Sequence, residues 1–390
     1  MPRALVLGWP ALAVLLLAAA CAPSAGPPAA PPTAVAAPAA SQPATTPSAA
    51  GGATAGPAAP GAASVPLAPV GRARVAVQNV AGDVLIYAAD KLGYYQQEGL
   101  DVEIVPILDA TQMTPALATE QIDIAGIGGT APMWNAVARN VPMKLVLDKG
   151  SFRPGFDFNA LVVRKDLYDS GQVRRLEDLR GRLVGLVPPG KASGNGAMIA
   201  AGLQRVGMSL DDLNIQAMTF ADQLPALANG AIDAGALGEP FLLRALRQGS
   251  VEKLVGLGEL YPGFTVSALC FSPTLYNNRA VARAYVRAYI RTIRDYLQAF
   301  AGPPDNPTRA QIESIMAGYT GIDAAVVHDM VPIGYSPNGL PNEDSLRYAY
   351  QYFRDLGLIT EPISDATFAA LWGTELVNDV LADLGRLPES

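Results

Sequence analysis

Residues 115–123 read PALATEQID, and residues 225–233 repeat the same pattern as PALANGAID. An apolar run that ends in glycine follows each copy, at Gly128 in the first and at Gly238 in the second. The pattern is typical of the end of a helix, a turn and a short buried strand, which we expect at residues 122–127 and 232–237. A chance match is the alternative in an alanine-rich chain, but the shared register favours one supersecondary unit that is used twice.

The segments just after these two strands are the first places to expect function. Ligands of open α/β sheets bind outside the carboxyl ends of the strands. The first strand is followed by GGTAP at residues 128–132 and the second by GEP at residues 238–240. Glycine lets a backbone approach a ligand closely, and proline is common at the start of a helix. We therefore expect the two segments to face one binding site.

The chain from residue 72 onwards alternates predicted strands and helices, which is the pattern of an α/β fold with mainly parallel sheets. Two such series are expected to form two lobes. The first lobe comprises residues 72–160 and 268–390, including the C-terminal helices, and the second comprises residues 161–267. Extended apolar runs at residues 159–164 and 267–272 are predicted to cross between the lobes as a hinge. Helices are expected at residues 83–97, 277–300, 307–318, 324–330, 342–356 and 364–384.

The first 71 residues have a different character. Arg3 precedes an apolar run that ends in LAAAC at residues 17–21, which resembles a bacterial lipoprotein signal with Cys21 as the lipidated residue. An ordinary secretory signal is the alternative. Residues 22–71 contain no charged side chain and are rich in Ala and Pro, so we expect a disordered tether. The folded part would then be anchored to the cell membrane and face the periplasm or the extracellular side.

Composition limits the partners. The chain has 390 residues, of which 50% are hydrophobic and 16% charged, enough for a large core and about two domains. A formal net charge of −7 and the lack of a basic stripe exclude nucleic acid as a partner. With Cys21 assigned to lipid, Cys270 is expected to be a buried thiol without a disulfide.

Two further segments resemble a known family. Residues 94–102 read YYQQEGLDV and residues 176–185 read LEDLRGRLVG. Both are similar to segments of the nitrate, sulfonate, taurine and thiamine-precursor group of solute-binding proteins. The resemblance implies the two-lobed type II periplasmic-binding-protein fold, which closes on a small molecule and delivers it to the permease and ATPase subunits of an ABC importer. It also implies a monomer without a cofactor, and it leaves the ligand open, because the group covers anions, vitamins and aromatic acids.

Residues 185–191 read GLVPPGK, which is most of a phosphate-binding P-loop placed between a predicted strand and a predicted helix. The Ser or Thr that would bind magnesium is replaced by Ala192, so we do not expect nucleotide hydrolysis. Instead, the backbone N–H groups of residues 190–194 and the Ser193 hydroxyl are expected at a helix N-terminus. Such a site suits a partial negative charge on a ligand.

Polar and aromatic residues near the predicted strand ends are the candidate ligand contacts. Glu239 is the strongest candidate, because its carboxylate would accept hydrogen bonds from N–H or O–H groups of the ligand. Each candidate has the alternative role of a capping or turn residue. The turn expected at residues 335–339 is either a cover for the mouth of the site or an ordinary surface loop. The full set is Gln78, Asn79, Asp109, Thr111, Thr130, Phe152, Arg153, Ser193, Asn195 and Glu239.

The sequence favours a binding protein over an enzyme. His328 is the only histidine and lies in an apolar context, so it is expected on a helix surface or in the core. No catalytic triad, metal cluster or CxxC motif is present. The same fold resembles fungal pyrimidine-precursor synthases, which use a histidine and a pyridoxal cofactor, and this chain supplies no such set. An enzyme of pyrimidine synthesis and a sensory ligand-binding protein remain the alternatives from other classes.

The balance of charges near the predicted strand ends bears on the ligand. Acidic candidates such as Glu239, Asp109 and Asp83 are at least as frequent as the basic Arg153 and Lys191. A nitrate or sulfonate site would need a dominant cationic or N–H cradle. We therefore expect a heteroaromatic vitamin or precursor, either riboflavin or a thiamine-type pyrimidine, stacked on aromatic rings. Aliphatic sulfonates, taurine, nitrate and aromatic acids are the alternative ligands.

Overall fold

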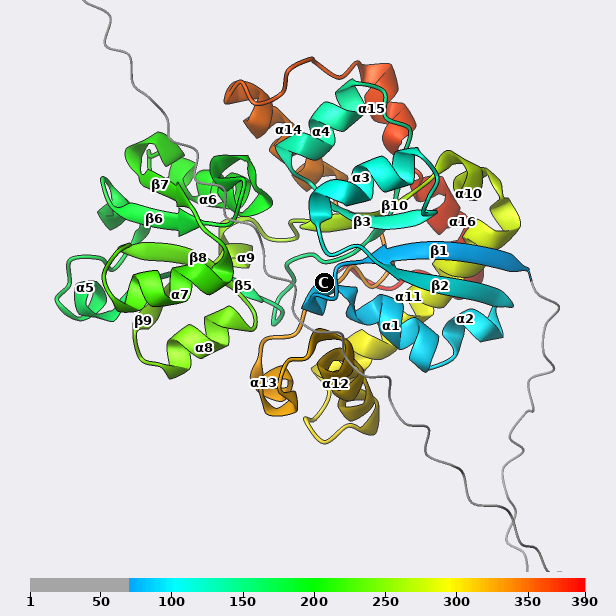
Figure 1. Cartoon of the computed structure of the whole chain (residues 1–390), viewed down its shortest axis with the longest axis horizontal. Helices are drawn as coiled ribbons and strands as arrows, with labels where there is room; N and C mark the ends of the chain where they lie inside the picture. The colour runs from blue at the N-terminus through cyan, green and yellow to red at the C-terminus, as the bar shows by residue number, and fades with distance from the viewer. Residues whose placement is uncertain (1–69, 390) are drawn as a thin grey trace, which may run out of the picture. The chain divides into compact units, whose positions relative to one another are not determined.

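Two five-stranded sheets form the framework of residues 70–389, the part of the chain that this computed structural model describes (Figure 1). The strand order is β2-β1-β3-β10-β4 in the first sheet and β7-β6-β8-β5-β9 in the second. Four strands of each sheet run parallel, and the fifth, β10 or β5, runs antiparallel. The predicted α/β fold with two mainly parallel sheets is therefore confirmed. The predicted lipidation site Cys21 and residues 22–69 of the predicted tether lie outside the described residues.

The strands of each sheet come from separate parts of the chain. The first sheet contains β1 (Gly71–Val77), β2 (Leu100–Pro106), β3 (Ile124–Gly128), β4 (Lys144–Asp148) and β10 (Ser267–Phe271). The second contains β5 (Asn159–Arg164), β6 (Leu183–Leu186), β7 (Asn214–Ala217), β8 (Ala234–Gly238) and β9 (Val251–Gly256). Residues 160–163 of β5 and 268–271 of β10 are buried apolar runs, as expected for central strands that helices cover on both faces.

Helices flank both sheets (Figure 1). Those up to the end of β9 are α1 (Val84–Lys91), α2 (Tyr94–Gln97), α3 (Ala110–Ala118), α4 (Ala131–Ala138), α5 (Lys165–Asp169), α6 (Gly194–Arg205), α7 (Phe220–Ala228) and α8 (Phe241–Arg247). The later ones are α9 (Leu257–Leu260), α10 (Pro273–Asn277), α11 (Arg279–Ala301), α12 (Pro307–Thr320), α13 (Ala324–Asp329), α14 (Glu343–Asp355), α15 (Asp365–Leu371) and α16 (Thr374–Leu384). The long helix α11 packs against α1, α2 and β1, whereas α14 contacts both α4 and α6. No helix in residues 70–389 combines the length and apolar character that a membrane span needs.

The repeated sequence forms the same unit in both sheets, from α3 to β3 and from α7 to β8. In each copy the proline carbonyl accepts the N–H group four residues later, at 3.0 Å in both. The aspartate that ends the repeat bonds the strand alongside: Asp123 Oδ2 accepts the N–H of Arg74 at 2.8 Å, and Asp233 Oδ2 accepts that of Leu183 at 3.1 Å. The spacing that the two copies share therefore corresponds to one local structure that occurs twice.

The two sheets are joined by paired segments that precede β5 and β10. The strands predicted to cross between the lobes are themselves central members of the two sheets. Immediately before them, Lys149 N donates to Ser267 O at 2.9 Å, Val266 N to Gly150 O at 2.8 Å and Phe152 N to Phe264 O at 3.0 Å. Residues 149–152 and 263–267 therefore run side by side as the crossing segments.

Two predicted helices are interrupted, so these two predictions were wrong in extent. The helix expected at residues 83–97 divides at Gly93, which has a left-handed φ of 79°. The helix expected at residues 364–384 divides between α15 and α16, where Gly373 N donates to Leu145 O at 2.8 Å. A Cβ atom at Gly373 would lie 2.8 Å from the Tyr276 ring. The second break depends on a contact with β4, which helical periodicity does not reveal.

Candidate ligand-binding site

A buried ion pair organises the loop that follows β1. Asp83 Oδ2 accepts the N–H groups of Gln78 at 2.9 Å and Val80 at 3.1 Å, while Oδ1 lies 2.9 Å from Lys149 Nζ. The side chains of Asp83 and Lys149 are 0% and 6% exposed. The Lys149 side chain crosses β3 at Gly126, where an added Cβ would lie 2.3 Å from its Cδ atom. Lys149 was not among the predicted site residues. A glycine within a buried strand is the sequence feature that indicates such a close neighbour.

The predicted contacts Gln78 and Asn79 lie in this loop beside an aromatic pair. Asn79 has a positive φ of 58°, and its Oδ1 accepts the Tyr87 hydroxyl at 2.7 Å. Tyr87 stacks on Tyr319 with ring centroids 4.1 Å apart, and the Tyr319 hydroxyl donates to Val80 O at 3.2 Å. The turn is thus held by a helix from the C-terminal part of the chain, which sequence spacing did not reveal.

Two predicted contacts form a helix cap of their own. Asp109 Oδ1 accepts the N–H of Thr111 at 2.9 Å and its hydroxyl at 2.7 Å, and both residues are exposed. These hydrogen bonds lower the pKa of Asp109. Thr130 precedes α4 without a side-chain capping bond, and Gly129 N donates to Val266 O in a crossing segment at 3.2 Å.

The start of α6 brings together a different set of polar groups. Ser193 is buried, and its hydroxyl donates to Gly190 O at 2.7 Å and accepts the N–H of Gly196 at 3.1 Å. The Ser193 hydroxyl is therefore engaged within its own helix turn. Asn195 Oδ1 accepts Asn159 Nδ2 at 3.3 Å. Asn195 Nδ2 is buried and has no hydrogen-bond partner among the described residues.

This unpaired amide lies at the carboxyl end of β8. Asn159 pairs with Gly238 across β5 and β8, and a Cβ atom at Gly238 would lie 2.5 Å from Asn159 Oδ1. The glycine that ends the second repeat thus makes room for the amide that contacts Asn195. Asn159 was predicted only as part of a hinge strand, and nothing in its local sequence indicated a place beside the α6 N-terminus.

Glu239 connects α8 to the segment after α13. Its Oε2 accepts the N–H of Leu243 at 3.1 Å and its Oε1 accepts that of Val331 at 3.2 Å. The side chain is half-buried, and burial raises its pKa. Close to this contact, Arg247 of α8 forms an ion pair with Asp329 of α13. Both carboxylate oxygens of Glu239 are therefore engaged with the backbone, one with α8 and one with the segment after α13.

Phe152 ends a crossing segment, and Arg153 follows it directly. Phe152 is 1% exposed and stacks on Phe158 with ring centroids 4.5 Å apart. Arg153 Nη2 lies 3.0 Å from Glu389 Oε2. Two other basic residues near the strand ends are also paired, Lys149 with Asp83 and Lys191 with Asp211.

Asp148 at the end of β4 is a buried carboxyl that the sequence did not single out. It accepts hydrogen bonds from Gly150 N at 3.1 Å, from the Ser151 hydroxyl at 2.7 Å and from Ser336 N at 2.7 Å. Burial is the largest influence and raises the pKa of Asp148 to about 6. Asp148 thereby links a crossing segment to the turn at residues 335–339, which was considered as a cover for the site.

The single histidine and the inner cysteine lie apart from these groups. His328 is on the surface of α13 with its side chain 46% exposed, and its Nδ1 lies 2.9 Å from Glu313 Oε2. Cys270 is fully buried in β10, as predicted, and burial raises the pKa of its thiol to about 12. Within residues 70–389 no group of three or more His, Cys, Asp or Glu side chains could hold a metal ion.

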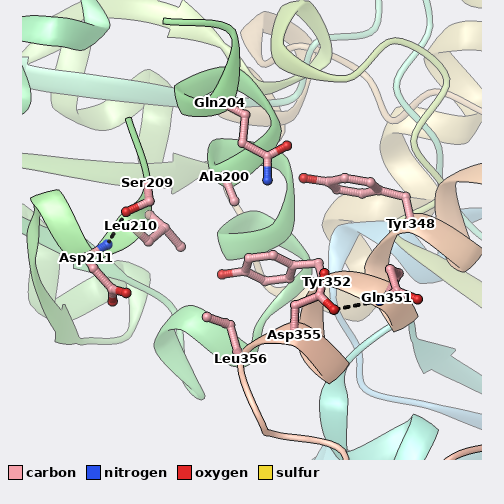
Figure 2. Close-up of a pocket in the computed structure, with 10 residues that line it drawn as sticks. All are labelled: Ala200, Gln204, Ser209, Leu210, Asp211, Tyr348, Gln351, Tyr352, Asp355 and Leu356. Atoms are coloured by element: carbon pink, nitrogen blue, oxygen red, sulfur yellow. Dashed lines mark hydrogen bonds between the residues drawn. The ribbon is translucent and has the colours of Figure 1, made fainter. Parts of the chain in front are cut away.

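A small cavity of about 190 Å³ lies away from the predicted contacts, between α6 and α14. Figure 2 shows Tyr348 and Tyr352 projecting from α14 and Gln204 reaching from α6 toward the Tyr348 hydroxyl. None of the predicted site residues lines it. The Tyr352 hydroxyl donates to Lys191 O at 3.1 Å and so joins α14 to the loop before α6.

Comparison with known proteins places this geometry in a family. Residues 83–298 match the family described as NMT1/THI5 like, which is more than half of the chain. The chain belongs to this family. A putative thiamine biosynthesis protein of Haemophilus influenzae is 25% identical over 217 residues, covering 55% of this chain and 64% of that relative. The match thus spans less than two thirds of that relative's length.

Solved structures with the same fold include two periplasmic binding proteins. The aliphatic sulphonate binding protein SsuA from Escherichia coli has a TM-score of 0.61 at 20% identity, covering 77% of this chain and 92% of SsuA. The nitrate-binding protein NrtA from Synechocystis PCC 6803 has a TM-score of 0.60 at 15% identity, covering 80% of this chain and 89% of NrtA. At these identities the likeness shows the fold, while the family match over residues 83–298 confirms the resemblance that residues 94–102 and 176–185 indicated.

Proposed function

We propose that this NMT1/THI5-like protein is the extracytoplasmic solute-binding component of an ABC importer, held at the cell membrane by a lipid on Cys21. The observation that carries the proposal is the pair of sheets with one topology, joined by two hydrogen-bonded crossing segments. In this arrangement two lobes close around a small molecule, and the ligand shifts the population toward the closed form that a permease recognises. No bond is made or broken.

Three contacts that connect the second sheet's helices to the C-terminal part of the chain support such a closure. Glu239 accepts the Val331 N–H, Arg247 pairs with Asp329, and the Tyr352 hydroxyl donates to Lys191 O. Each joins groups that lie in different lobes of the proposed domain division. Each is a polar contact that water replaces at small cost, as a reversible closure requires.

For the ligand we propose a flat, largely neutral heteroaromatic vitamin or precursor, such as riboflavin or a thiamine-type pyrimidine. The basic side chains nearest the strand ends, Lys149, Arg153 and Lys191, all have carboxylate partners. An inorganic anion would therefore have to compete with these carboxylates. Asn195 Nδ2 is a buried donor without a partner in the described part of the chain, and it suits a carbonyl or ring nitrogen of a neutral ligand.

Calorimetric titration of the purified chain with riboflavin, an aminopyrimidine and taurine tests the ligand class. We expect Asn195→Ala to weaken binding of the heteroaromatic ligand by about tenfold, since one buried hydrogen bond is lost. Asn378→Ala on the exposed face of α16 is the matched control and is expected to bind as the wild type does. Saturable binding of taurine alone, or equal affinities for the two variants, would contradict the ligand proposal.

Closure itself has an independent test. Small-angle X-ray scattering of the chain with and without saturating ligand is expected to show a smaller radius of gyration in the bound state. A radius that does not change on saturation contradicts lobe closure and leaves the ligand assignment untouched.

A further inference from the structure

The C-terminal tail after α16 is held against the turn at residues 335–339 by side chains of that region. Arg294 Nη1 donates to Leu384 O at 3.0 Å, and its Nη2 donates to Gly385 O. Asn338 brackets Leu387, because its Oδ1 accepts the Leu387 N–H at 2.9 Å and its Nδ2 donates to Leu387 O at 2.8 Å. These contacts fix the course of the tail up to its last described residue.

The tail ends with a carboxylate in a cradle of donors. Glu389 Oε1 accepts the Ser336 hydroxyl at 2.9 Å and Asn338 Nδ2 at 2.8 Å. Its Oε2 lies 3.0 Å from Arg153 Nη2. A hydroxyl, an amide and a guanidinium thus converge on one carboxylate, which is the donor set that oxyanion sites use.

The three donor side chains are largely buried, whereas the Glu389 carboxylate lies on the more exposed tail. Ser336 and Asn338 are 0% and 1% exposed, and the Arg153 side chain is 15% exposed. The Glu389 side chain is 40% exposed. Ser336 is also held from the side of the fold, because its N–H donates to Asp148 at 2.7 Å, and the nearly buried guanidinium would need another counter-charge if the tail left.

The groups around Arg153 show why it needs a carboxylate partner at the cradle. Its Nε donates to the Ser151 hydroxyl at 3.3 Å, and that hydroxyl donates in turn to Asp148. Asp148 already receives three donors, and it reaches Arg153 through the Ser151 hydroxyl without forming an ion pair with it. Glu389 is the one carboxylate among the described residues that forms an ion pair with Arg153.

We propose that Arg153, Ser336 and Asn338 form a carboxylate-binding site, and that the chain's own Glu389 occupies it as an internal competitor. A small external carboxylate binds there when the tail is displaced. Because Arg153 directly follows a crossing segment and Ser336 is bonded to Asp148 just before it, the tail also controls whether this site is neutral or cationic. The inference goes beyond solute transport and does not depend on which solute is carried.

The experiment compares propionate binding, followed by NMR titration, in the full chain and in Glu389→Gln. Propionate is the smallest analogue of the Glu389 side chain. We expect Glu389→Gln to bind propionate about tenfold more tightly than the wild type, because the internal competitor has lost its charge. Glu361→Gln, an exposed carboxylate elsewhere, is the matched control and is expected to bind propionate as weakly as the wild type.

A second substitution locates the site. Arg153→Ala in the Glu389→Gln background is expected to abolish the gain, with Ser336→Ala as a milder change at the same cradle and circular dichroism as the test of folding. Equal propionate affinity in wild type and Glu389→Gln overturns the proposal. A gain that survives both Arg153→Ala and Ser336→Ala overturns it as well, since propionate would then bind elsewhere.

Discussion

At the scale of single residues, two buried carboxyl groups near strand ends are the main feature of the described region. Asp148 and Asp83 are both fully buried carboxyl groups near strand ends. Asp83 has Lys149 as a direct counter-charge, whereas Asp148 has only hydrogen-bond donors. The two sites therefore respond differently to loss of a partner, since only Asp83 would lose a counter-charge.

Asp148 predicts a pH dependence of stability with a definite sign. Its pKa is about 6 in the folded protein and 3.8 ordinarily, so between these values the folded state holds a proton that the unfolded chain has lost. This contribution to stability is complete below pH 3.8 and is lost as the pH rises through 6. Its full size is on the order of 3 kcal/mol.

Urea denaturation from pH 4 to pH 7 checks this prediction. The wild type is expected to lose stability relative to Asp148→Asn as the pH rises, since the variant does not titrate at this site. Asp305→Asn at an exposed position is the control. Parallel curves for wild type and Asp148→Asn would mean that Asp148 ionises normally.

At the scale of elements, the repeated helix and strand unit shows how one local pattern serves two environments. Both copies place an aspartate where it accepts a backbone N–H of the neighbouring parallel strand. The strands β3 and β8 differ in what crosses them. Lys149 lies over Gly126 of β3, while Gln223 lies close to Gly235 of β8. Small residues in these strands therefore follow from close side-chain approach as well as from backbone freedom.

Gly126→Ala is expected to destabilise the protein by about 3 kcal/mol or more. The new methyl group would lie 2.3 Å from Lys149 Cδ, so the lysine would have to move away from buried Asp83, which breaks a buried ion pair. Gly318→Ala in α12 is the control, because a Cβ atom there meets no neighbour and alanine favours helix. Thermal unfolding of both variants measures the contrast, and equal melting temperatures would contradict it.

At the scale of the whole described region, contacts between distant elements set the proposed equilibrium between open and closed forms. Removing Arg247 and the Tyr352 hydroxyl together takes away two of the contacts that join the second sheet's helices to the C-terminal part of the chain. Arg247→Ala combined with Tyr352→Phe is expected to raise the radius of gyration without ligand and to weaken ligand binding several-fold.

The control for this double variant is Arg354→Ala, an exposed residue of α14 that forms no ion pair within residues 70–389. It is expected to behave as the wild type does in scattering and in calorimetry. If the double variant also keeps the wild-type radius and affinity, these contacts do not bias closure, and the hinge alone sets the equilibrium.

Much of the architecture could be predicted from local patterns. The alternation of strands and helices, the doubled unit and the family segments at residues 94–102 and 176–185 each depend on neighbours within a few turns of the chain. Periodicity and turn residues carry that information because hydrogen bonds within helices and turns are local. The helices predicted at residues 83–97 and 364–384 are instead broken near Gly93 and Gly373, and the second break comes from a contact with β4.

The site depended on groups that meet only after folding. Lys149 reaches Asp83, Asn159 reaches Asn195, and Arg153 reaches Glu389, each pair joining separate parts of the chain. Candidate polar residues could be chosen from the strand ends, but their partners could not, because a side chain's environment is set by long-range packing. Local sequence was enough for the α/β order and the repeat, whereas long-range contacts decided which charges are paired, which amide lacks a partner within residues 70–389 and where the tail lies.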